Sequence, residues 1–471
     1  MKQTEYILIP SKKHLFMFLV VIVFTSCEEF IEIPPPRSDL TRVSVFSNDA
    51  TAQAAVLDIY YQMGLAGFAS GTQLGITYLT ALSSDELTNY NVSSFSGQFE
   101  QFYQNALTQD GFLVELLWSG PYACIYGANA ILESIASADE VSDDVKRQLE
   151  GEAKFIRAFC HFYLLNLFGD VPLVLSSDYR VNAKLPRSNS SDVYSQIVAD
   201  LKAAQELLPN DYEFSNNERT RPNRLAATAL LARVYLYWGD WVNSESESTK
   251  ILDQGLVSLN EDLSQVFLKN SKEAIWQLSS DYDNPPTFRF SISSPGGVPP
   301  NSALSPGLIQ EFEVGDLRKD AWTGQVTNGV DTFYYAAKYK ASGSVDITEY
   351  YMILRLAEQY LIRAEARAHL DNRTGAIADL DAIRSRAGLP LIGNTNPSVS
   401  ESELLALIEK ERRVELFTEW GHRWFDLKRT GRSDVELSPI KADWQPTDVL
   451  YPIPEIQLLN SGSIVTQNPG Y

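Results

Sequence analysis

Apolar residues recur every three to four positions along much of this chain, the spacing that places them on one face of an α-helix. The two longest stretches of this kind are residues 112–137 and 142–168, and the second ends at Gly169, a residue that commonly closes a helix. Shorter stretches of the same kind are residues 48–63, 191–208, 223–238, 241–254, 350–370 and 373–387. The pattern predicts a mainly α-helical protein with minor β-structure, in which successive helices pack as antiparallel pairs.

Two of the predicted helix pairs carry small residues on faces that could meet. The stretches AATALLARVYLYWGD, from Ala226, and LIRAEARAHLDN, from Leu361, are rich in alanine, and a tight turn at Gly239 joins two of the helices. Small and aromatic positions of this kind are typical of tetratricopeptide-like pairs, although no strict repeat of about 34 residues runs through the chain. We therefore expect a stacked scaffold of helix pairs.

Two parts of the chain lack this helical periodicity. Residues 64–111 are rich in Gly, Ser, Thr and Asn, and residues 271–348 are broken repeatedly by Pro and Gly. Both parts also carry many aromatic residues. Irregular segments of this length inside a folded domain are usually functional. The sequence therefore predicts a loop-rich lobe that contributes the ligand site.

The N-terminal region has the layout of an export signal. Two lysines precede the apolar residues 15–24, and the small residues Thr25 and Ser26 stand directly before Cys27. Such a run is too short for a permanent membrane-spanning helix but suits a signal peptide. The order resembles a bacterial lipoprotein signal, so we expect residues 1–26 to be removed and Cys27 to be acylated. The alternative is an ordinary cleaved signal followed by an incidental cysteine.

The segment after Cys27 predicts a spacer between the membrane and the folded protein. It contains three consecutive prolines, which favour an extended conformation without internal hydrogen bonds. We therefore divide the mature chain into a lipidated cysteine with an extended tether, residues 27–45, and a folded body, residues 46–471. Acyl chains on Cys27 would hold this body on a membrane.

Charge and reactive side chains narrow the range of partners. Without residues 1–26 the chain keeps 36 basic and 59 acidic residues, a net charge of −23, which disfavours nucleic acids and anionic lipid surfaces. Cys124 and Cys160 lie in apolar helical patterns, and two buried free thiols are expected in preference to a disulfide. The remaining histidines show no metal-ligand spacing. We predict no cofactor and no metal, with a structural Ca²⁺ ion in a loop as an open alternative.

Five blocks of sequence resemble the SusD/RagB family of surface lipoproteins. They are WSGPYACIYGANAILESI from Trp118, EAKFIRAFCHFYLLNLFGDVPLV from Glu152, YMILRLAEQYLIRAEARAHLDNRTGAIADLDAIRSRAGLP from Tyr351, ERRVELFTEWGHRWFDLKRTGR from Glu411, and YPIPEIQLLNSGSIVTQNPGY from Tyr451. The resemblance covers the chain from Cys27 to Tyr471, and a set of blocks in this order is specific.

This resemblance implies a fold and a role. It implies a SusD-like, mainly α-helical body with tetratricopeptide-like helix pairs and a loop-rich ligand-binding lobe. It also implies a surface-exposed lipoprotein of the outer membrane that captures a nutrient for a SusC-like TonB-dependent outer-membrane transporter. The helical side would face that partner.

The block from Glu411 to Arg432 alternates charges at near-helical spacing and also contains many apolar residues. Such a mixture can be mistaken for a catalytic cluster. Partly buried ion pairs that fix helix ends are the preferred interpretation, because such networks set register more often than they perform chemistry. The sequence QNPGY is interpreted in the same way, as a docked tail.

Glycan sites place aromatic rings against the C–H faces of sugars, while polar side chains bind the hydroxyl groups. The aromatic candidates in the loop-rich parts are Tyr90, Phe95, Tyr282, Phe288, Trp322 and Tyr334. The polar candidates are Asp85, Asn89, Asn91, Asp281, Asp283 and Arg289. Burial in the core is the alternative for each aromatic residue, and a structural role in its loop is the alternative for Asp85.

Three functions remain open at this point. The preferred one is glycan binding without turnover. The family also includes peptide collectors, so a peptide-binding nutrient lipoprotein is the second. A lipid-anchored glycoside hydrolase with two catalytic carboxylates is the third. Other chemistry has less support, because the chain contains no GxSxG, HExxH, GxxxxGK[ST] or GxGxxG motif.

Overall fold

The computed structural model describes residues 42–65, 68–90, 95–279, 298–340 and 347–471. The chain divides into two compact units, residues 1–45 and residues 46–471, and the second is called the body below. The described part of the first unit contains the short helix α2 (Arg42–Val45). The predicted signal peptide and Cys27 lie outside the described residues. Among the described helices, none is long and apolar enough to pass through a bilayer.

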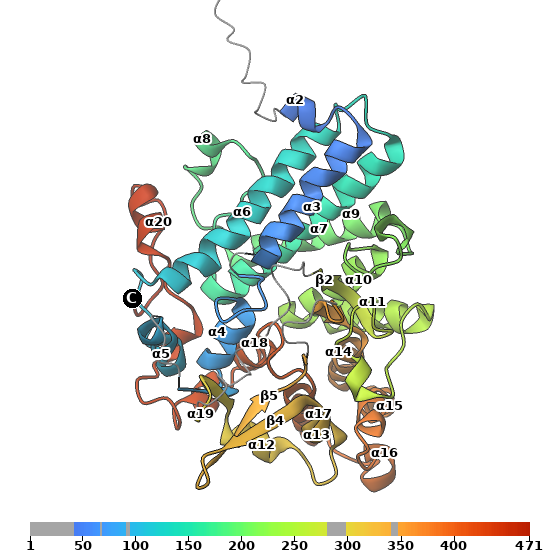
Figure 1. The fold of residues 1–471 in the computed structure, drawn as a ribbon, viewed down its shortest axis with the longest axis vertical. Coiled ribbons are helices and arrows are strands. Elements are labelled where there is room, and N and C mark those ends of the chain that lie inside the picture. The colour runs from blue at the N-terminus through green and yellow to red at the C-terminus, as the bar shows by residue number, and fades with distance from the viewer. Residues whose placement is uncertain (1–41, 66–67, 91–94, 280–297, 341–346) are drawn as a thin grey trace, which may run out of the picture. The chain divides into compact units, whose positions relative to one another are not determined.

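Paired helices form the scaffold of the body (Figure 1). These helices are α3 (Asp49–Leu65), α6 (Phe112–Ile135), α7 (Asp143–Phe168), α9 (Ser190–Leu207), α10 (Arg224–Trp238), α11 (Trp241–Gln254), α14 (Leu356–His369) and α15 (Arg373–Arg386). Helix α7 packs on α6 and α9, and α10 packs on α9 and α11. The stack continues as α11 packs on α14, and α14 packs on α15. The predicted mainly helical architecture of paired helices is thus confirmed.

Polar caps and a glycine set the ends of these helices. The side chains of Asn223, Asp240 and Asn372 accept hydrogen bonds from backbone N–H groups at the starts of α10, α11 and α15. Between α10 and α11, Gly239 adopts the left-handed conformation with φ of +79°, which disfavours any residue with a side chain. The turn predicted at this glycine is therefore confirmed.

Shorter helices complete the body around this scaffold. The α-helices are α4 (Ile76–Ser83), α5 (Ser96–Gln104), α8 (Tyr179–Asn182), α12 (Pro306–Glu311), α13 (Leu317–Trp322), α16 (Ile392–Thr395), α17 (Glu401–Glu415), α18 (His422–Arg429), α19 (Ser433–Leu437) and α20 (Glu455–Asn460). The 3₁₀ helices are η2 (Glu213–Ser215), η3 (Leu263–Gln265) and η5 (Pro446–Val449).

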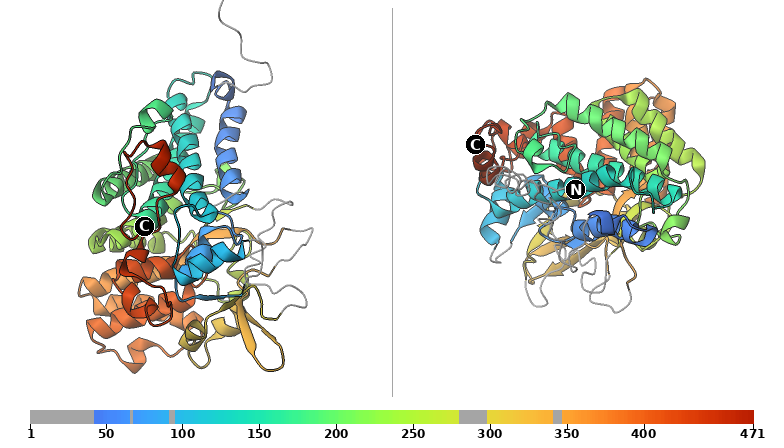
Figure 2. Two further views of the ribbon diagram at one scale, coloured as in Figure 1. Left: turned by 90° about the vertical axis from the view of Figure 1, so that its left-hand side faces the viewer. Right: turned by 90° about the horizontal axis from the view of Figure 1, so that it is seen from above.

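The described strands form small antiparallel pairs. They are β1 (Leu87–Asn89) with β3 (Ser302–Leu304), β2 (Ala274–Leu278) with β6 (Tyr351–Arg355), and β4 (Thr323–Thr327) with β5 (Thr332–Ala336). The β4–β5 hairpin lies at the end of the body opposite the start of α3 in both side views (Figures 1 and 2). This hairpin and the β1–β3 pair are the parts of the fold that shape the candidate site.

The structure corrects two sequence predictions. The helix predicted from residue 350 begins only at Leu356, because residues 351–355 form β6, whose residues are all buried. Such a strand has apolar residues on both faces, so its sequence cannot be distinguished by periodicity from the start of a buried helix. The predicted loop part 64–111 also contains α4 and α5, so it is more regular than its composition indicated.

Aromatic rings from distant segments fill the centre of the body. Phe159 of α7 contacts Trp276 of β2 and Trp420, with ring centroids 5.4 Å apart in both pairs. Both indoles are fully buried. Close aromatic pairs of this kind contribute about 0.5–1.5 kcal/mol each beyond the area they bury. In the same helix, Cys160 is a buried free thiol, as is Cys124 in α6, which confirms the expectation for both cysteines.

Hydrogen bonds attach the segment 451–468 to the C-terminal end of α7. Tyr451 donates its backbone N–H to the carbonyl oxygen of Leu167 at 2.9 Å, and Asn468 donates its Nδ2 to the carbonyl oxygen of Phe168 at 2.8 Å. The Tyr451 hydroxyl lies 2.7 Å from Ser83 Oγ in α4. These bonds supply partners to carbonyl groups at the end of the helix, where no further helical turn can do so, and Arg187 Nη2 also reaches the Phe168 oxygen at 3.4 Å. Within QNPGY, residues 467–471, Asn468 makes one of these bonds and the Tyr471 hydroxyl donates to the carbonyl oxygen of Leu450 at 3.0 Å, which agrees with the docked-tail interpretation.

Candidate functional site

A hollow of about 590 Å³ opens beside the β4–β5 hairpin. It lies between this hairpin, the β1–β3 pair and α12. The residues that line it are Thr88, Tyr90, Ala303, Leu304, Pro306, Ile309, Gln310, Asp331, Thr332, Phe333 and Tyr334. Its volume falls in the range of about 300–1,000 Å³ that is usual for ligand pockets.

Tyr90 and Phe333 form an aromatic corner of the hollow. Their ring centroids lie 5.4 Å apart at an interplanar angle of 83°, and 38% of Tyr90 remains exposed. The backbone N–H of Tyr90 donates to the carbonyl oxygen of Asn301 at 2.8 Å, directly beyond the β1–β3 ladder. The sheet therefore fixes the backbone of Tyr90 and leaves part of its side chain free for contact with a ligand.

Tyr334 adds a second phenol to the same hollow. It pairs with Gln325 across the hairpin, and the Lys319 ammonium lies 5.6 Å from its ring centroid. Its neighbour Tyr335 instead packs over Gly324, where a side chain on residue 324 would collide with the ring. Tyr334 is the residue of this tyrosine pair that lines the hollow.

Polar side chains of several kinds surround the rings. Gln310 comes from α12, Thr88 from β1, and Asp331 from the turn of the hairpin. Asn328 Oδ1 holds that turn, accepting a hydrogen bond from the Asp331 backbone N–H at 2.7 Å. The arrangement offers hydroxyl, amide and carboxylate groups at the edge of an aromatic surface, which suits a polyhydroxylated ligand better than a purely apolar one.

Buried ion pairs fix the segments that carry the lining residues of the hollow. The Asp85 carboxylate bonds to the Arg423 guanidinium at 2.8 and 2.9 Å and to Arg413 at 2.7 Å. Arg413 also reaches Glu311 of α12 at 2.7 Å. Ser305, directly before α12, donates its backbone N–H to the carbonyl oxygen of Glu86 at 2.8 Å. These contacts join β1 and α12 to the helices α17 and α18.

Asp85 and Glu86, the two neighbouring acidic residues of these contacts, differ in protonation state. Burial acts to raise the pKa of Asp85, but the bonds and charges of Arg423 and Arg413 outweigh it and lower the pKa below its ordinary value. Burial, with the nearby Asp85 charge, raises the pKa of Glu86 to about 8. Asp85 is therefore a structural anion, and Glu86 is a mostly neutral carboxyl group at pH 7.

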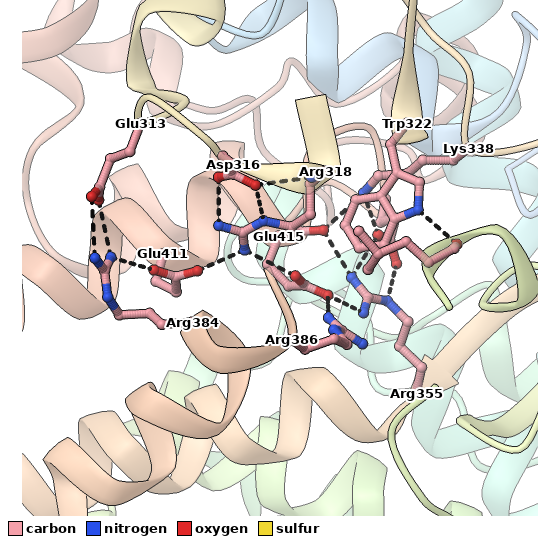
Figure 3. A network of polar contacts seen from close by, with 12 residues as sticks. Glu313, Asp316, Arg318, Trp322, Lys338, Arg355, Arg384, Arg386, Glu411 and Glu415 are labelled. Atoms are coloured by element: carbon pink, nitrogen blue, oxygen red, sulfur yellow. Dashed lines mark hydrogen bonds and ion pairs between the residues drawn. The ribbon is translucent and has the colours of Figure 1, made fainter. Parts of the chain in front are cut away.

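A larger network of the same kind attaches the hairpin to the helical scaffold (Figure 3). Arg318, in α13 directly before β4, bonds to Glu411 and Glu415 of α17 at 2.6 and 3.0 Å. Lys338, shortly after β5, bonds to Glu419 at 2.5 Å, and Arg355 of β6 joins Glu415 and Glu419. Every one of these side chains is at least nine-tenths buried.

This network is structural in character. Burial acts to raise the pKa of Glu415, but Arg386, Arg355 and Arg318 outweigh it and hold the pKa well below its ordinary value. The carboxylate therefore stays ionised and has no proton to give. The preferred interpretation of the charged block, as ion pairs that fix helix ends, agrees with this geometry. Within the described part of the chain, no group of His, Cys, Asp and Glu residues could hold a metal ion.

Ten of the twelve predicted site residues fall into three groups in the structure. Tyr90 and Tyr334 line the hollow together. Asn89 and Phe95 do not line it: Asn89 donates its amide to Glu100 at 2.7 Å, and Phe95 stacks on Phe112 at 5.9 Å. The third group lies outside the described residues and comprises Asn91, Asp281, Tyr282, Asp283, Phe288 and Arg289.

Two predicted contacts are wrong. Trp322 is fully buried, and its indole N–H donates to the carbonyl oxygen of Leu263 at 3.0 Å. The Lys338 ammonium lies 5.0 Å from its ring centroid, so the indole is enclosed by the charged network rather than exposed. Asp85 is likewise 6% exposed and occupied by its arginine partners. Both residues support the site and neither reaches its surface.

Sequence reasoning missed Phe333, Gln310 and Asp331. Phe333 directly precedes Tyr334, and adjacent residues of a strand point to opposite faces, so their positions in the sequence do not predict that both rings line one hollow. The Asn-Gly-Val-Asp sequence at residues 328–331 is a turn signal that could have placed Asp331 at the tip of a hairpin. Gln310 carried no signal, because its place in the site depends on how α12 packs.

Comparison with known proteins agrees with this architecture. A family model described as "Starch-binding associating with outer membrane" matches residues 46–236, and the SusD family model matches residues 318–471. SusD-like protein P2 from Formosa agariphila is 27% identical, with 98% of this chain and 100% of that protein covered. A SusD-like protein from Bacteroides ovatus is 24% identical, with 88% and 82% covered.

Solved structures show the same fold. A laminarin-binding SusD-like protein superposes with a TM-score of 0.75 at 25% identity, covering 90% of this chain and 100% of that one. A SusD superfamily protein from Bacteroides vulgatus superposes with a TM-score of 0.79 at 20% identity, with the same coverage. Both halves of the body match the family, and its helix pairs recur in the solved relatives. The chain therefore belongs to the SusD family.

Proposed function

We propose that this protein captures a neutral glycan in the hollow between β1, α12 and the β4–β5 hairpin and passes it on chemically unchanged. The observation that carries the proposal is the meeting of Tyr90, Phe333 and Tyr334, from two distant segments, at one hollow bordered by hydroxyl, amide and carboxylate groups. Aromatic faces bind the C–H faces of sugars, and the polar groups bind hydroxyls. No cofactor is needed for binding of this kind.

The composition of the hollow favours binding over hydrolysis. Glycoside hydrolysis uses a pair of carboxyl groups on either side of the scissile bond. Among the described residues that line the hollow, Asp331 alone is acidic. The nearby acidic residues Asp85 and Glu86 are both buried, and Asp85 is held in ion pairs with Arg413 and Arg423. Incubation with laminarin that releases new reducing ends would contradict this part of the proposal.

Laminarin is the first ligand to test, because a solved relative with the same fold binds it. Replacing Tyr90 or Tyr334 with alanine should weaken laminarin binding about tenfold each, since loss of one aromatic contact is worth roughly 1–2 kcal/mol. Tyr61→Ala, which removes a half-exposed ring from α3 far from the hollow in sequence and fold, is the matched control. Calorimetric titration measures all three.

The outcomes of this titration separate glycan from peptide capture. Equal affinity in wild type, Tyr90→Ala and Tyr334→Ala would show that the hollow is not the glycan site. Absence of binding to laminarin, starch and xylan, together with peptides that co-purify with the protein, would favour the peptide-collecting alternative.

We further propose that the protein acts at the cell surface, held in the outer membrane through an acylated Cys27, and delivers its ligand to a SusC-like TonB-dependent transporter. The order of the N-terminal residues and the family description of outer-membrane association support this proposal. Mass spectrometry of the mature protein should find residue 27 as the first residue, carrying acyl chains. Co-purification of a TonB-dependent barrel with the detergent-extracted protein tests the partner.

A further inference from the structure

A second hollow lies on a different part of the body, between α6, the α8 segment and α20. Its volume is about 300 Å³, and α6, α8 and α20 lie well apart from the β4–β5 hairpin in Figure 1. The residues that line it are Trp118, Ser119, Tyr122, Pro172, Val174, Asn182, Ala183, Leu185, Gln457, Asn460, Ser461 and Val465. It shares no lining residue with the first hollow.

Two aromatic rings form one wall of this second hollow. Trp118 and Tyr122 lie one turn apart on α6, with ring centroids 5.2 Å apart. The Tyr122 hydroxyl donates to the carbonyl oxygen of Pro172 at 2.8 Å, which fixes a ring that stays partly exposed, whereas Trp118 is only 3% exposed. A flat ring of this kind is what the C–H face of a sugar requires.

Amide groups face the rings across the hollow. Asn182 Nδ2 donates to the carbonyl oxygen of Ser176 at 2.7 Å, which fixes the amide, while its buried Oδ1 has no hydrogen-bond partner among the described residues. A buried acceptor without a partner costs about 1–3 kcal/mol, so its occurrence calls for an explanation. Gln457 bonds only weakly to Glu115, at 3.4 Å, and can turn toward a ligand.

The lining is also neutral. None of the described residues that line this hollow carries a charge, although the chain as a whole is strongly acidic. Charged ligands would therefore find no counterion here, whereas hydroxyl groups would find both acceptors and donors. The combination of a flat aromatic wall, amides and a neutral lining fits one sugar residue.

We propose that this second hollow binds a single neutral sugar residue, with its C–H face on Tyr122 and one hydroxyl donating to Asn182 Oδ1. The choice of sugar rests on the proposed function, because the residue would belong to the same glycan held at the first hollow. Two sites on one rigid body favour long chains over short ones, since the second contact forms at a high effective concentration. The second hollow would thus select polymers.

Trp118 provides a direct readout of this site. The full mature protein, labelled with 5-fluorotryptophan, gives separate ¹⁹F signals for its tryptophans, and Trp118→Phe assigns the signal of interest. Titration with D-glucose and with laminarin should shift the Trp118 signal. Asn182→Leu, which keeps a similar size but removes the acceptor, should weaken this response at least fivefold, and Gln457→Ala on the surface of α20 should weaken it too.

Controls separate this proposal from the proposed function. Leu459→Ala removes an exposed side chain from the same helix α20 that does not line the hollow, and should leave the Trp118 response as in wild type. A Trp118 signal that stays still, while Tyr90-dependent laminarin binding is intact, would refute the second site and leave the first in place. A Trp118 response in Asn182→Leu and Gln457→Ala that equals the wild-type response would also refute it. Loss of sugar binding at both hollows would overturn both proposals.

Discussion

Arg355 is the residue on which the charged network depends most heavily, and its replacement by methionine makes a quantitative test. Its fully buried guanidinium donates five hydrogen bonds, at 2.6–3.0 Å, to Glu273, Glu415 and Glu419. Methionine fills a similar volume but leaves one negative charge more in the interior than the remaining cations balance.

The structure also sets the size of the effect. Among the described residues, Glu415 would keep Arg318 and Arg386 as partners, and Glu273 would keep Arg386, but Glu419 would keep Lys338 alone. Removing one partner from a buried ion pair costs about 3–5 kcal/mol. Because whole proteins are stable by about 5–15 kcal/mol, Arg355→Met should be folded but close to its limit. Urea unfolding followed by far-ultraviolet circular dichroism measures this loss.

A second substitution tests the cause of that loss. Glu419→Gln in the Arg355→Met background removes one anion together with one cation, and its amide oxygen can still accept a hydrogen bond from Lys338. If an uncompensated charge is responsible, the double variant should regain about 1–3 kcal/mol relative to Arg355→Met. A cost below about 1 kcal/mol for Arg355→Met, or a double variant that is less stable still, would refute the reasoning.

Three further predictions concern other parts of the fold. Burial, with the Arg157 charge, lowers the pKa of His161 to about 3 from an ordinary value of 6.5, so the unfolded chain takes up a proton that the folded protein does not. His161 should therefore reduce the stability by about 2 kcal/mol at pH 5, and His161→Gln should lose about that much less than wild type between pH 8 and pH 5 in urea unfolding. The contribution of His422, whose pKa burial also lowers, should remain in this variant. Ser400→Ala removes the capping box at the start of α17 and should cost about 1 kcal/mol in the same assay, whereas Ser400→Asp should cost much less. Gly239→Ala has free space for its methyl group but a φ of +79°, so it should cost about 1–2 kcal/mol, and a stability equal to wild type would contradict the assigned turn.

The helices were predictable because their determinants are local. The residues that cap α10 and α11, and Gly239 between them, stand beside the apolar repeat that they delimit, so the predicted ends agree with the observed ones to within one residue. The strand β6 was not predicted, because its burial on both faces depends on its packing between segments that are distant in the sequence. Local sequence contains no record of that packing.

The candidate site was predictable only in part for the same reason. Tyr90 and Tyr334 stand out as aromatic residues in irregular segments, and both line the hollow. Trp322 has the same sequence context, yet it is enclosed by Lys338 and the surrounding ion pairs. Whether such a ring faces solvent depends on partners more than ten residues away, which composition does not reveal.

The docking of segment 451–468 onto the end of α7 has a consequence for the order in which the fold is completed. The residues of α7 are synthesised long before residue 451, but the carbonyl oxygen of Leu167 gains its bond from Tyr451, and that of Phe168 its bond from Asn468, only when the later segment docks. A chain that lacks this segment would leave the C-terminal end of α7 without these contacts and more accessible to proteases. The C-terminal end of α7 therefore reaches its final set of hydrogen bonds only once this segment is in place.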